Sequence, residues 1–294
     1  MSQDQPWTIG RLLTWTNDYL REHGSDSSRL DAEILLAEAR GCKRIELYTA
    51  YEEVASEQTR VAFRELVRRR AEGEPVAYLV GRKEFYSLSF HVTHDVLIPR
   101  PETELIIVTM LDLAKKRPAQ DGPLQIADVG TGSGVIAVTA AKYWQNSRVT
   151  AMDLSDKALE IARFNIDQHG VSERVTLIHS DLFSKVPPDA RFDFILSNPP
   201  YVSQAEYKEL PRDVKDHEPE MALIGGPTGC EVIARLIEQS ATRLNPGGCL
   251  LIEVSPMIAA EVQHMIGDHA SFASSAIVKD SAGHARVVVA TRKD

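Results

Sequence analysis

From Leu124 to the C-terminus, short apolar segments alternate with amphipathic ones, and this alternation limits the fold more than any other feature of the chain. The short segments predict buried strands, whereas the segments between them have the apolar spacing of helices. Strands that alternate with helices imply right-handed crossovers and a mostly parallel, doubly wound α/β sheet. Seven strands are expected: LQIADV, RVTAMD, RVTLIHSD, FDFILS, GCLLIEV, SSAIVKD and ARVVVAT. The last two are close together in the sequence and predict an antiparallel edge.

The first 74 residues have a different pattern, in which apolar residues recur at helical spacing. We therefore expect a small all-helical N-terminal domain over residues 1–74. The third helix of this domain should turn Val61, Leu66 and Val67 inward.

A short linker should join this domain to the sheet. KEFYSLSFHV holds two apolar runs around Ser87, which predict a β-hairpin within residues 75–99. The segment that follows has Pro101 at its start, acidic residues next and basic residues at its end, as expected for a helix. The main domain should then occupy residues 100–294.

Composition narrows the class of protein. Apolar residues make up 43% of the chain and charged residues 26%, which is ordinary for a globular protein. No apolar run approaches the roughly 18 residues that a membrane span requires. The N-terminus lacks the basic and apolar regions of a signal peptide, so a cytoplasmic location is expected.

The net charge of −9 opposes general attraction to nucleic acid. The arginine run at 68–70 could still serve a local partner, although a solvated surface is the simpler interpretation. We expect no direct nucleic-acid partner.

Neither cysteines nor histidines indicate a metal site. Cys42, Cys230 and Cys249 are far apart and form no CxxC pair, which argues against disulfides and structural zinc. His91 and His94 lack a third clustered ligand. No metal is therefore expected.

The strongest binding signal is the segment DVGTGSG, between an expected strand and an expected helix. Glycines there permit a tight turn and close approach of a ligand, and the helix offers unpaired N–H groups to an anion. Alone, the segment could equally be a plain turn. The candidate cofactor-binding residues are Gly130, Thr131, Gly132, Ser133 and Gly134.

The next two strand ends fit a nucleoside. Asp153 ends the second strand and could accept hydrogen bonds from two ribose hydroxyls; the alternative is a helix cap, for which Ser155 is better placed. At the end of the third strand, Asp181, Leu182 and Phe183 could border an adenine ring or could simply be packed. GTGSG with an acidic second strand resembles the S-adenosylmethionine (SAM) methyltransferases of the Rossmann-like class I more than nicotinamide enzymes.

SNPPYVS follows the fourth strand, although two prolines cannot continue a sheet ladder. A planar NH₂ group is a poor nucleophile because its lone pair is delocalised. The side-chain oxygen of Asn198 and the carbonyl of Pro199 could hold both hydrogens of such a group and aim its lone pair at a methyl donor. Pro200 would stiffen the segment and Tyr201 would stack on the flat substrate.

Together these segments resemble the HemK/PrmC family of release factor glutamine methyltransferases. The segments that carry the resemblance are EPVAYLVGRKEF, LIPRPETE, DVGTGSG, SNPPY and DSAGHARVVVA. The resemblance implies a release-factor-binding N-terminal domain and methylation of the glutamine amide nitrogen (N5) in the GGQ motif of release factors, in support of translation termination. It also implies that residues 130–134, Asp153, Leu182 and Asn198 contact SAM, and that residues 198–201 contact the glutamine.

Two segments depart from the family pattern. Glu253 is followed by Val-Ser-Pro-Met where the family commonly has a glycine and a glutamine, and ALIGGPTG lacks an aspartate before its last glycine. Both departures are expected to lie at the periphery of the amide pocket.

Two other functions remain open at this stage. An N6-adenine DNA or RNA methyltransferase also acts on a planar NH₂ group, but it would require a basic domain that recognises nucleic acid. A catalytically idle SAM-binding adaptor is the other, and the intact NPPY and GTGSG segments disfavour it. We expect a monomer.

Overall fold

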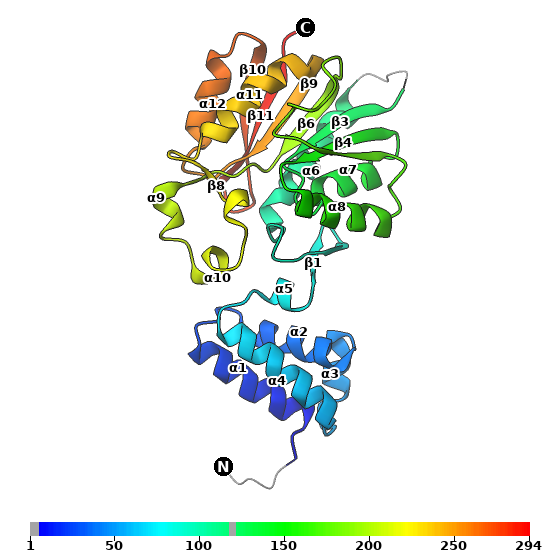
Figure 1. The fold of residues 1–294 in the computed structure, drawn as a ribbon, viewed down its shortest axis with the longest axis vertical. Helices are drawn as coiled ribbons and strands as arrows, with labels where there is room; N and C mark the ends of the chain where they lie inside the picture. The colour runs from blue at the N-terminus through cyan, green and yellow to red at the C-terminus, as the bar shows by residue number, and fades with distance from the viewer. Residues whose placement is uncertain (1–5, 118–121) are drawn as a thin grey trace. The chain divides into compact units, whose positions relative to one another are not determined.

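The computed structural model describes residues 6–117 and 122–294 (Figure 1). These residues form two compact units. The first, which we term the helical unit, comprises the described residues up to Gly81 together with Arg212–His217. The second, the sheet unit, comprises the described residues of Arg82–Pro211 and Glu218–Asp294. No helix among the described residues is long and apolar enough to cross a membrane.

The helical unit is held together by apolar side chains that its helices turn toward one another. Its elements are α1 (Ile9–Glu22), α2 (Ser28–Arg40), α3 (Arg44–Thr49), α4 (Glu57–Ala71), α5 (Val76–Leu79) and α10 (Arg212–Lys215). On α4, Phe63 and Val67 are buried in this core and Leu66 packs against it, whereas Val61 is 57% exposed. The prediction for Val61 is wrong because residues 63, 66 and 67 share one face of the helix, and Val61 lies on another.

A β-hairpin begins the sheet unit. Strands β1 (Arg82–Phe85) and β2 (Leu88–His91) pair antiparallel, and Phe85 and Phe90 join the core beneath them. Asn165 fixes the hairpin, since its Oδ1 accepts from His91 N at 2.8 Å and its Nδ2 donates to His91 O at 2.9 Å.

Within the described residues the main sheet has seven strands, in the order β10-β11-β9-β6-β3-β4-β5. The strands are β3 (Leu124–Val129), β4 (Ser147–Asp153), β5 (Val175–His179), β6 (Phe192–Ser197), β9 (Leu244–Glu253), β10 (Phe272–Lys279) and β11 (Ala285–Arg292). Strands β9, β6, β3, β4 and β5 are parallel to one another. Strand β11 is antiparallel to both β9 and β10. The predicted class I fold is confirmed, although only β10 of the antiparallel pair is at the edge.

Helices cover both faces of the sheet (Figure 1). One face packs against α6 (Glu104–Lys116), α7 (Val135–Tyr143) and α8 (Asp156–Gln168); the other packs against α11 (Glu231–Arg243) and α12 (Ala259–Asp268). Side chains along a strand therefore alternate between two cores, as Phe194 and Ile195 do on β6. Burial on both faces explains why the strands read as continuous apolar runs.

A buried ionic cluster supports the end of the sheet away from the carboxyl ends of β3 and β6. Asp193, which is 3% exposed, accepts from Arg117 Nη2 at 3.1 Å, Gln125 N at 2.9 Å and Asn245 Nδ2 at 3.1 Å. The carboxylate thus neutralises a largely buried guanidinium and joins three segments.

Replacing this carboxylate should destabilise the fold strongly. We expect Asp193→Ala to lower the free energy of unfolding by about 3 kcal/mol, since it leaves a buried Arg117 without its charge partner. Urea denaturation measures this. Asp112→Ala removes an exposed partner of Lys115 and is the control, with a midpoint near that of the wild type. Equal midpoints for both variants would contradict the importance of the cluster.

Candidate active site

The glycine loop, residues 130–134, joins β3 to α7, and its backbone is accessible to a ligand. Gly130, Gly132 and Gly134 have φ values of 74°, 54° and 83°, which disfavour any side chain. A Cβ on Gly130 or Gly132 would meet no atom within 4 Å, whereas one on Gly134 would lie 3.3 Å from Ala162 Cα. The first two glycines therefore leave room for a ligand, and the third lets α7 and α8 approach.

Asp128, at the end of β3, fixes this loop by hydrogen bonds. Its Oδ2 accepts from Thr131 Oγ1 at 2.6 Å and Ala137 N at 3.0 Å, and the residue is completely buried. Burial raises the pKa of Asp128 to about 7, although the two hydrogen bonds that the carboxylate accepts act to lower it. The Thr131 hydroxyl is consequently directed inward. Ser133 is also buried, so the loop presents backbone rather than side chains.

Gly134, at the N-cap of α7, has no side chain with which to cap the helix, although Asp128 already accepts from Ala137 N in the first turn. The N–H groups of Val135 and Ile136 are therefore the ones that can serve an anionic group of a ligand.

Asp153 lies at the carboxyl end of β4, against the glycine loop. Its Oδ2 accepts from Gly132 N at 2.8 Å, and its Oδ1 accepts from Ser155 N at 2.9 Å. Burial raises the pKa of this carboxyl group. Ser155 caps α8 by accepting from Ala158 N, as predicted. A carboxylate has about four lone-pair sites, so a site not used by these N–H groups and that of Leu154 is available to a hydroxyl donor.

The segment that follows β5 contains one residue with a strained backbone. Leu182 is a non-glycine residue with a φ of 47°, and such positions persist only where the surroundings impose them. Asp181 is paired with Arg235 at 2.5 Å. Phe183 is buried in the core beside Phe192. Of the three residues expected to border adenine, the Phe183 ring belongs to the core.

Asn198 follows β6 and is held by a segment far away in sequence. Its Nδ2 donates to Thr103 Oγ1 at 3.1 Å. Thr103 ends a short 3₁₀ helix, η1 (Pro101–Thr103), and is 2% exposed. Preceding it, Ser197 Oγ donates to Val129 O at 2.7 Å and ties β6 to β3 at the same edge. The PRPETE and NPPY segments therefore meet directly.

Tyr201 points toward a buried carboxyl group. Its hydroxyl lies 3.5 Å from Glu253 Oε1, and burial raises the Tyr201 pKa. Burial also raises the pKa of Glu253 to about 7, a rise that hydrogen bonding from Thr103 and the charge of Arg286 oppose. Among the described residues, Glu253 Oε2 has no hydrogen-bond partner.

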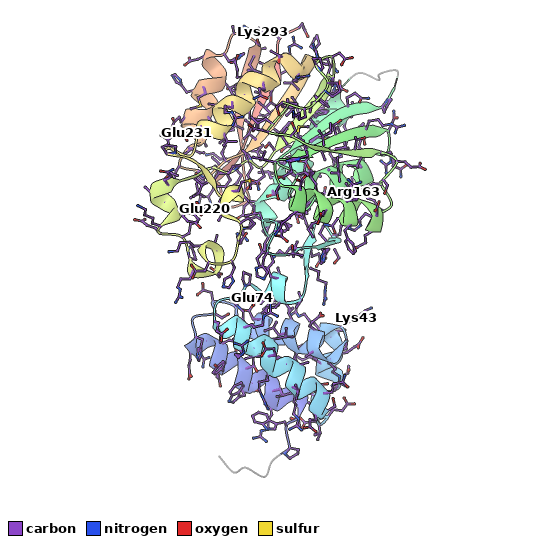
Figure 2. All side chains as sticks on the ribbon, viewed as in Figure 1. Lys43, Glu74, Arg163, Glu220, Glu231 and Lys293 are labelled. Carbon is purple, nitrogen blue, oxygen red and sulfur yellow. The ribbon has the colours of Figure 1, made fainter. Side chains whose placement is uncertain are left out.

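The GGPTG loop packs on the NPPY backbone. A Cβ on Gly225 would lie 2.4 Å from Pro200 O, and one on Gly229 would lie 2.4 Å from Tyr201 O. Strands β7 (Val202–Ser203) and β8 (Ile224–Gly226) pair beside this contact. Glu231, labelled in Figure 2, accepts from the backbone N–H groups of the loop.

The expectation that the ALIGGPTG segment is peripheral is therefore wrong, because its GGPTG loop contacts the backbone of the two residues before Val202. For the segment after Glu253 the expectation stays a prediction: Glu253 itself contacts Tyr201, whereas Met257 is 78% exposed. Pattern alone could not reveal this, because both contacts join strand ends that are far apart in the sequence.

Charged residues that sequence analysis missed fix the PRPETE segment. Glu218 accepts from Ile98 N at 3.1 Å and from Arg100 at 2.5 Å. Arg286 lies 3.5 Å from Glu102 and donates to Asp280 at 2.9 Å. The closing Asp-x-x-Gly-x-x-Arg segment thus supports η1 from β11. In the sequence, the only sign that this closing segment matters was that it is one of the segments that carry the family resemblance.

Two family models match parts of the chain. Residues 11–81 match the PrmC N-terminal domain, and residues 106–212 match the methyltransferase small domain. The chain is 53% identical to a release factor glutamine methyltransferase of Rhodopirellula baltica, over 98% of this chain and 97% of that protein. A protein of the same name from Chlorobaculum tepidum is 39% identical, over 95% and 96%.

Solved structures support the fold. The hMettl16 catalytic domain, in complex with an RNA hairpin, superposes with a TM-score of 0.58 over 78% of this chain and 80% of that one. Its sequence identity is 15%, so this similarity concerns the fold alone.

The buried Asp128 should make stability depend on pH. Its folded pKa lies above its unfolded value, so the folded state retains a proton that the unfolded state releases, and stability falls as pH rises from about 4 to about 7. We expect Asp128→Asn to lack this loss, so that its stability relative to the wild type rises by about 3 kcal/mol from about pH 5 to about pH 8.

Urea denaturation at several pH values measures the difference. Asp189→Asn removes a carboxylate from an exposed position and is the control. A difference between Asp128→Asn and the wild type that stays constant with pH would contradict the raised pKa.

Proposed function

The chain belongs to the release factor glutamine methyltransferase family, and we propose that it transfers a methyl group from SAM to the N5 amide nitrogen of the glutamine in the GGQ motif of peptide chain release factors. The observation that carries the proposal is the fixed amide of Asn198, at the carboxyl end of β6 and beside the strand that leads to the glycine loop. Open α/β sheets bind ligands at this edge.

The substrate amide must be made nucleophilic. Because Asn198 Nδ2 donates to Thr103, Oδ1 is the atom of that amide available to accept a hydrogen. The Pro199 carbonyl accepts the second, and the φ restriction of Pro199 and Pro200 limits its movement. Holding both hydrogens out of line with the incoming methyl group favours the geometry in which the nitrogen lone pair is free to react. The proton is acidic once the nitrogen is alkylated, so no strong base is needed.

The residues around the glycine loop fit SAM. Open space over Gly130 and Gly132 suits close contact of the loop with the ligand, and the N–H groups of Val135 and Ile136 at the start of α7 suit its carboxylate. Asp153 retains acceptor capacity for a ribose hydroxyl, and Leu182, which follows β5, is the residue that we expect to border the adenine ring. When bound, SAM supplies an electrophilic methyl group on a sulfonium.

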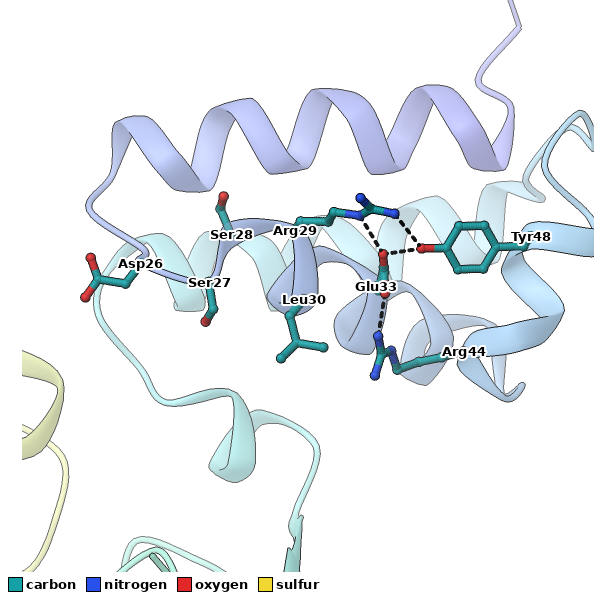
Figure 3. A pocket seen from close by; sticks show the side chains of 8 residues that line it. All are labelled: Asp26, Ser27, Ser28, Arg29, Leu30, Glu33, Arg44 and Tyr48. Atoms are coloured by element: carbon teal, nitrogen blue, oxygen red, sulfur yellow. Dashed lines mark hydrogen bonds and ion pairs between the residues drawn. The ribbon is translucent and has the colours of Figure 1, made fainter. Parts of the chain in front are cut away.

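We propose that residues 1–74 form a domain that binds the release factor, that residues 75–99 form a linker, and that residues 100–294 form the methyltransferase domain. An open pocket of about 460 Å³ in the helical unit supports the first assignment (Figure 3). There, Arg29, Arg44 and Tyr48 surround the buried Glu33. The polar and charged side chains that line this pocket are suited to contact with another protein. Because release factors act in the cytoplasm, we also propose a cytoplasmic location for this protein.

An N6-adenine methyltransferase is the second candidate, and the arginine run argues against it. Arg68 pairs with Glu65 and Glu72, while Arg69 and Arg70 also pair with carboxylates of the helical unit. These pairs reduce the positive charge that nucleic acid would require. An idle SAM-binding adaptor is disfavoured by the intact NPPY and GTGSG segments.

Labelled SAM should therefore transfer its methyl group to release factor and not to DNA or RNA. Mass spectrometry should find the label on the GGQ glutamine. Label found only in nucleic acid would reject the proposal in favour of the adenine methyltransferase, and cofactor binding without any transfer would favour the adaptor.

Loss of the Asn198 side chain should affect the chemical step. We expect Asn198→Ala to lower kcat about 100- to 1,000-fold, as for other positioned polar groups, with little change in the Kd for SAM. Gln145→Ala removes an exposed amide and is the control. A kcat for Asn198→Ala equal to that of the wild type would exclude the role given to Asn198.

A further inference from the structure

Gly225, in the GGPTG loop, is a glycine because of what it contacts and not because of its own backbone conformation. Its φ is outside the left-handed region that favours glycine. A Cβ at this position would, however, lie 2.4 Å from Pro200 O and 2.6 Å from Gly229 O. Both of these are backbone atoms, which cannot turn aside as the end of a side chain can. Glycine is therefore required here by the close approach of the loop to the NPPY segment.

The contact between the loop and the NPPY segment continues along the chain. A Cβ on Gly229 would lie 2.4 Å from Tyr201 O. The next residue, Val202, donates its N–H to Leu223 O at 2.9 Å, where β7 pairs with β8. The loop and its strand thus contact three successive residues that follow Pro199.

The loop is itself fixed to a helix that packs on the sheet. The Glu231 carboxylate accepts from Thr228 N at 2.9 Å and from Gly229 N at 3.1 Å. Glu231 is the first residue of α11, which packs on the sheet through the completely buried Ile233 and Leu236. The backbone that contacts the NPPY segment is therefore supported by the core.

We propose that Gly225, with the support of Glu231, is a positioning residue that fixes the Pro199 carbonyl for catalysis. This inference rests on the proposed function, in which that carbonyl accepts one hydrogen of the substrate amide. Gly225 touches neither substrate nor cofactor in this scheme. It lets the loop approach the Pro200 carbonyl closely enough to prevent its displacement. Because the φ angles of both prolines are restricted, a movement of Pro200 is transmitted to Pro199 through the peptide that joins them.

The contact distance sets the size of the displacement that a side chain would cause. Cβ atoms in proteins essentially never lie within 3.0 Å of such a neighbour, so a Cβ at residue 225 must separate from Pro200 O by at least 0.6 Å, the difference between 3.0 and 2.4 Å. An N–H···O hydrogen bond tolerates a range of only about 0.5 Å in length. Misplacement by about 1 Å can lower a rate about 100-fold. Even when the loop shares the movement, the bond from the substrate to Pro199 O is weakened.

Matched glycine-to-alanine variants of the full chain test the positioning role with release factor and labelled SAM. We expect Gly225→Ala to lower kcat about 10- to 100-fold with little change in the Kd for SAM, since the glycine loop is untouched. Gly267→Ala is the control, because Gly267 is exposed on α12 and a Cβ there would meet no atom within 4 Å. A Gly225→Ala variant with the kcat of the wild type, or one that loses SAM affinity in proportion to kcat, would overturn the proposal.

A second variant keeps Gly225 and tests its support in case Gly225→Ala does not fold. Glu231→Ala leaves the N–H groups of Thr228 and Gly229 without this acceptor, and we expect kcat to fall about 3- to 10-fold at unchanged SAM affinity. Glu238→Ala removes a carboxylate that is 75% exposed on the same helix and is the control. Equal kcat values for Glu231→Ala and Glu238→Ala would overturn the part assigned to Glu231.

A measurement without turnover separates failure of this inference from failure of the proposed function. The carbonyl ¹³C signals of Pro199 and Pro200 should shift in Gly225→Ala and keep their wild-type positions in Gly267→Ala. If release factor is not methylated but these signals behave as expected, only the proposed function fails. If methylation occurs and the signals are the same in both variants, only the inference fails.

Discussion

The hydrogen bond from Asn198 to Thr103 joins residues that are 95 positions apart, and the proposed methyl transfer depends on it. It fixes a flexible side chain in one orientation before any substrate arrives, which lowers the cost of forming the reactive geometry. Thr103 is held by the ionic contacts of Glu218 and Arg286 with its neighbours, and Asn198 by the strand that precedes it.

Sheet topology explains why these groups meet at one edge. Parallel strands end on the same side, so the glycine loop, Asp153 and Asn198 are brought together by β3, β4 and β6. The two buried cores hold each strand on both faces. A site built at the ends of such strands moves little, and its loops are further fixed by buried carboxyl groups such as Asp128.

Much of the fold was predictable because its signals are local. Strand length, glycines at a turn and the two prolines after β6 can be read from neighbouring residues. Val61 was misassigned although the helical spacing of residues 63, 66 and 67 already places Phe63, and not Val61, on the buried face of α4. Thr103, Glu218 and the contact of Glu253 with Tyr201 could not be derived, since each depends on a partner about 50 or more residues away.

The pair of oxygens offered by Asn198 and Pro199 is the central claim, and a crystal structure with S-adenosylhomocysteine and a GGQ peptide tests it most directly. We expect the glutamine nitrogen to lie about 2.7 to 3.2 Å from both Asn198 Oδ1 and Pro199 O, with Asn198 Nδ2 still bonded to Thr103. A glutamine bound elsewhere, or an Asn198 side chain turned away from the cofactor, would contradict it.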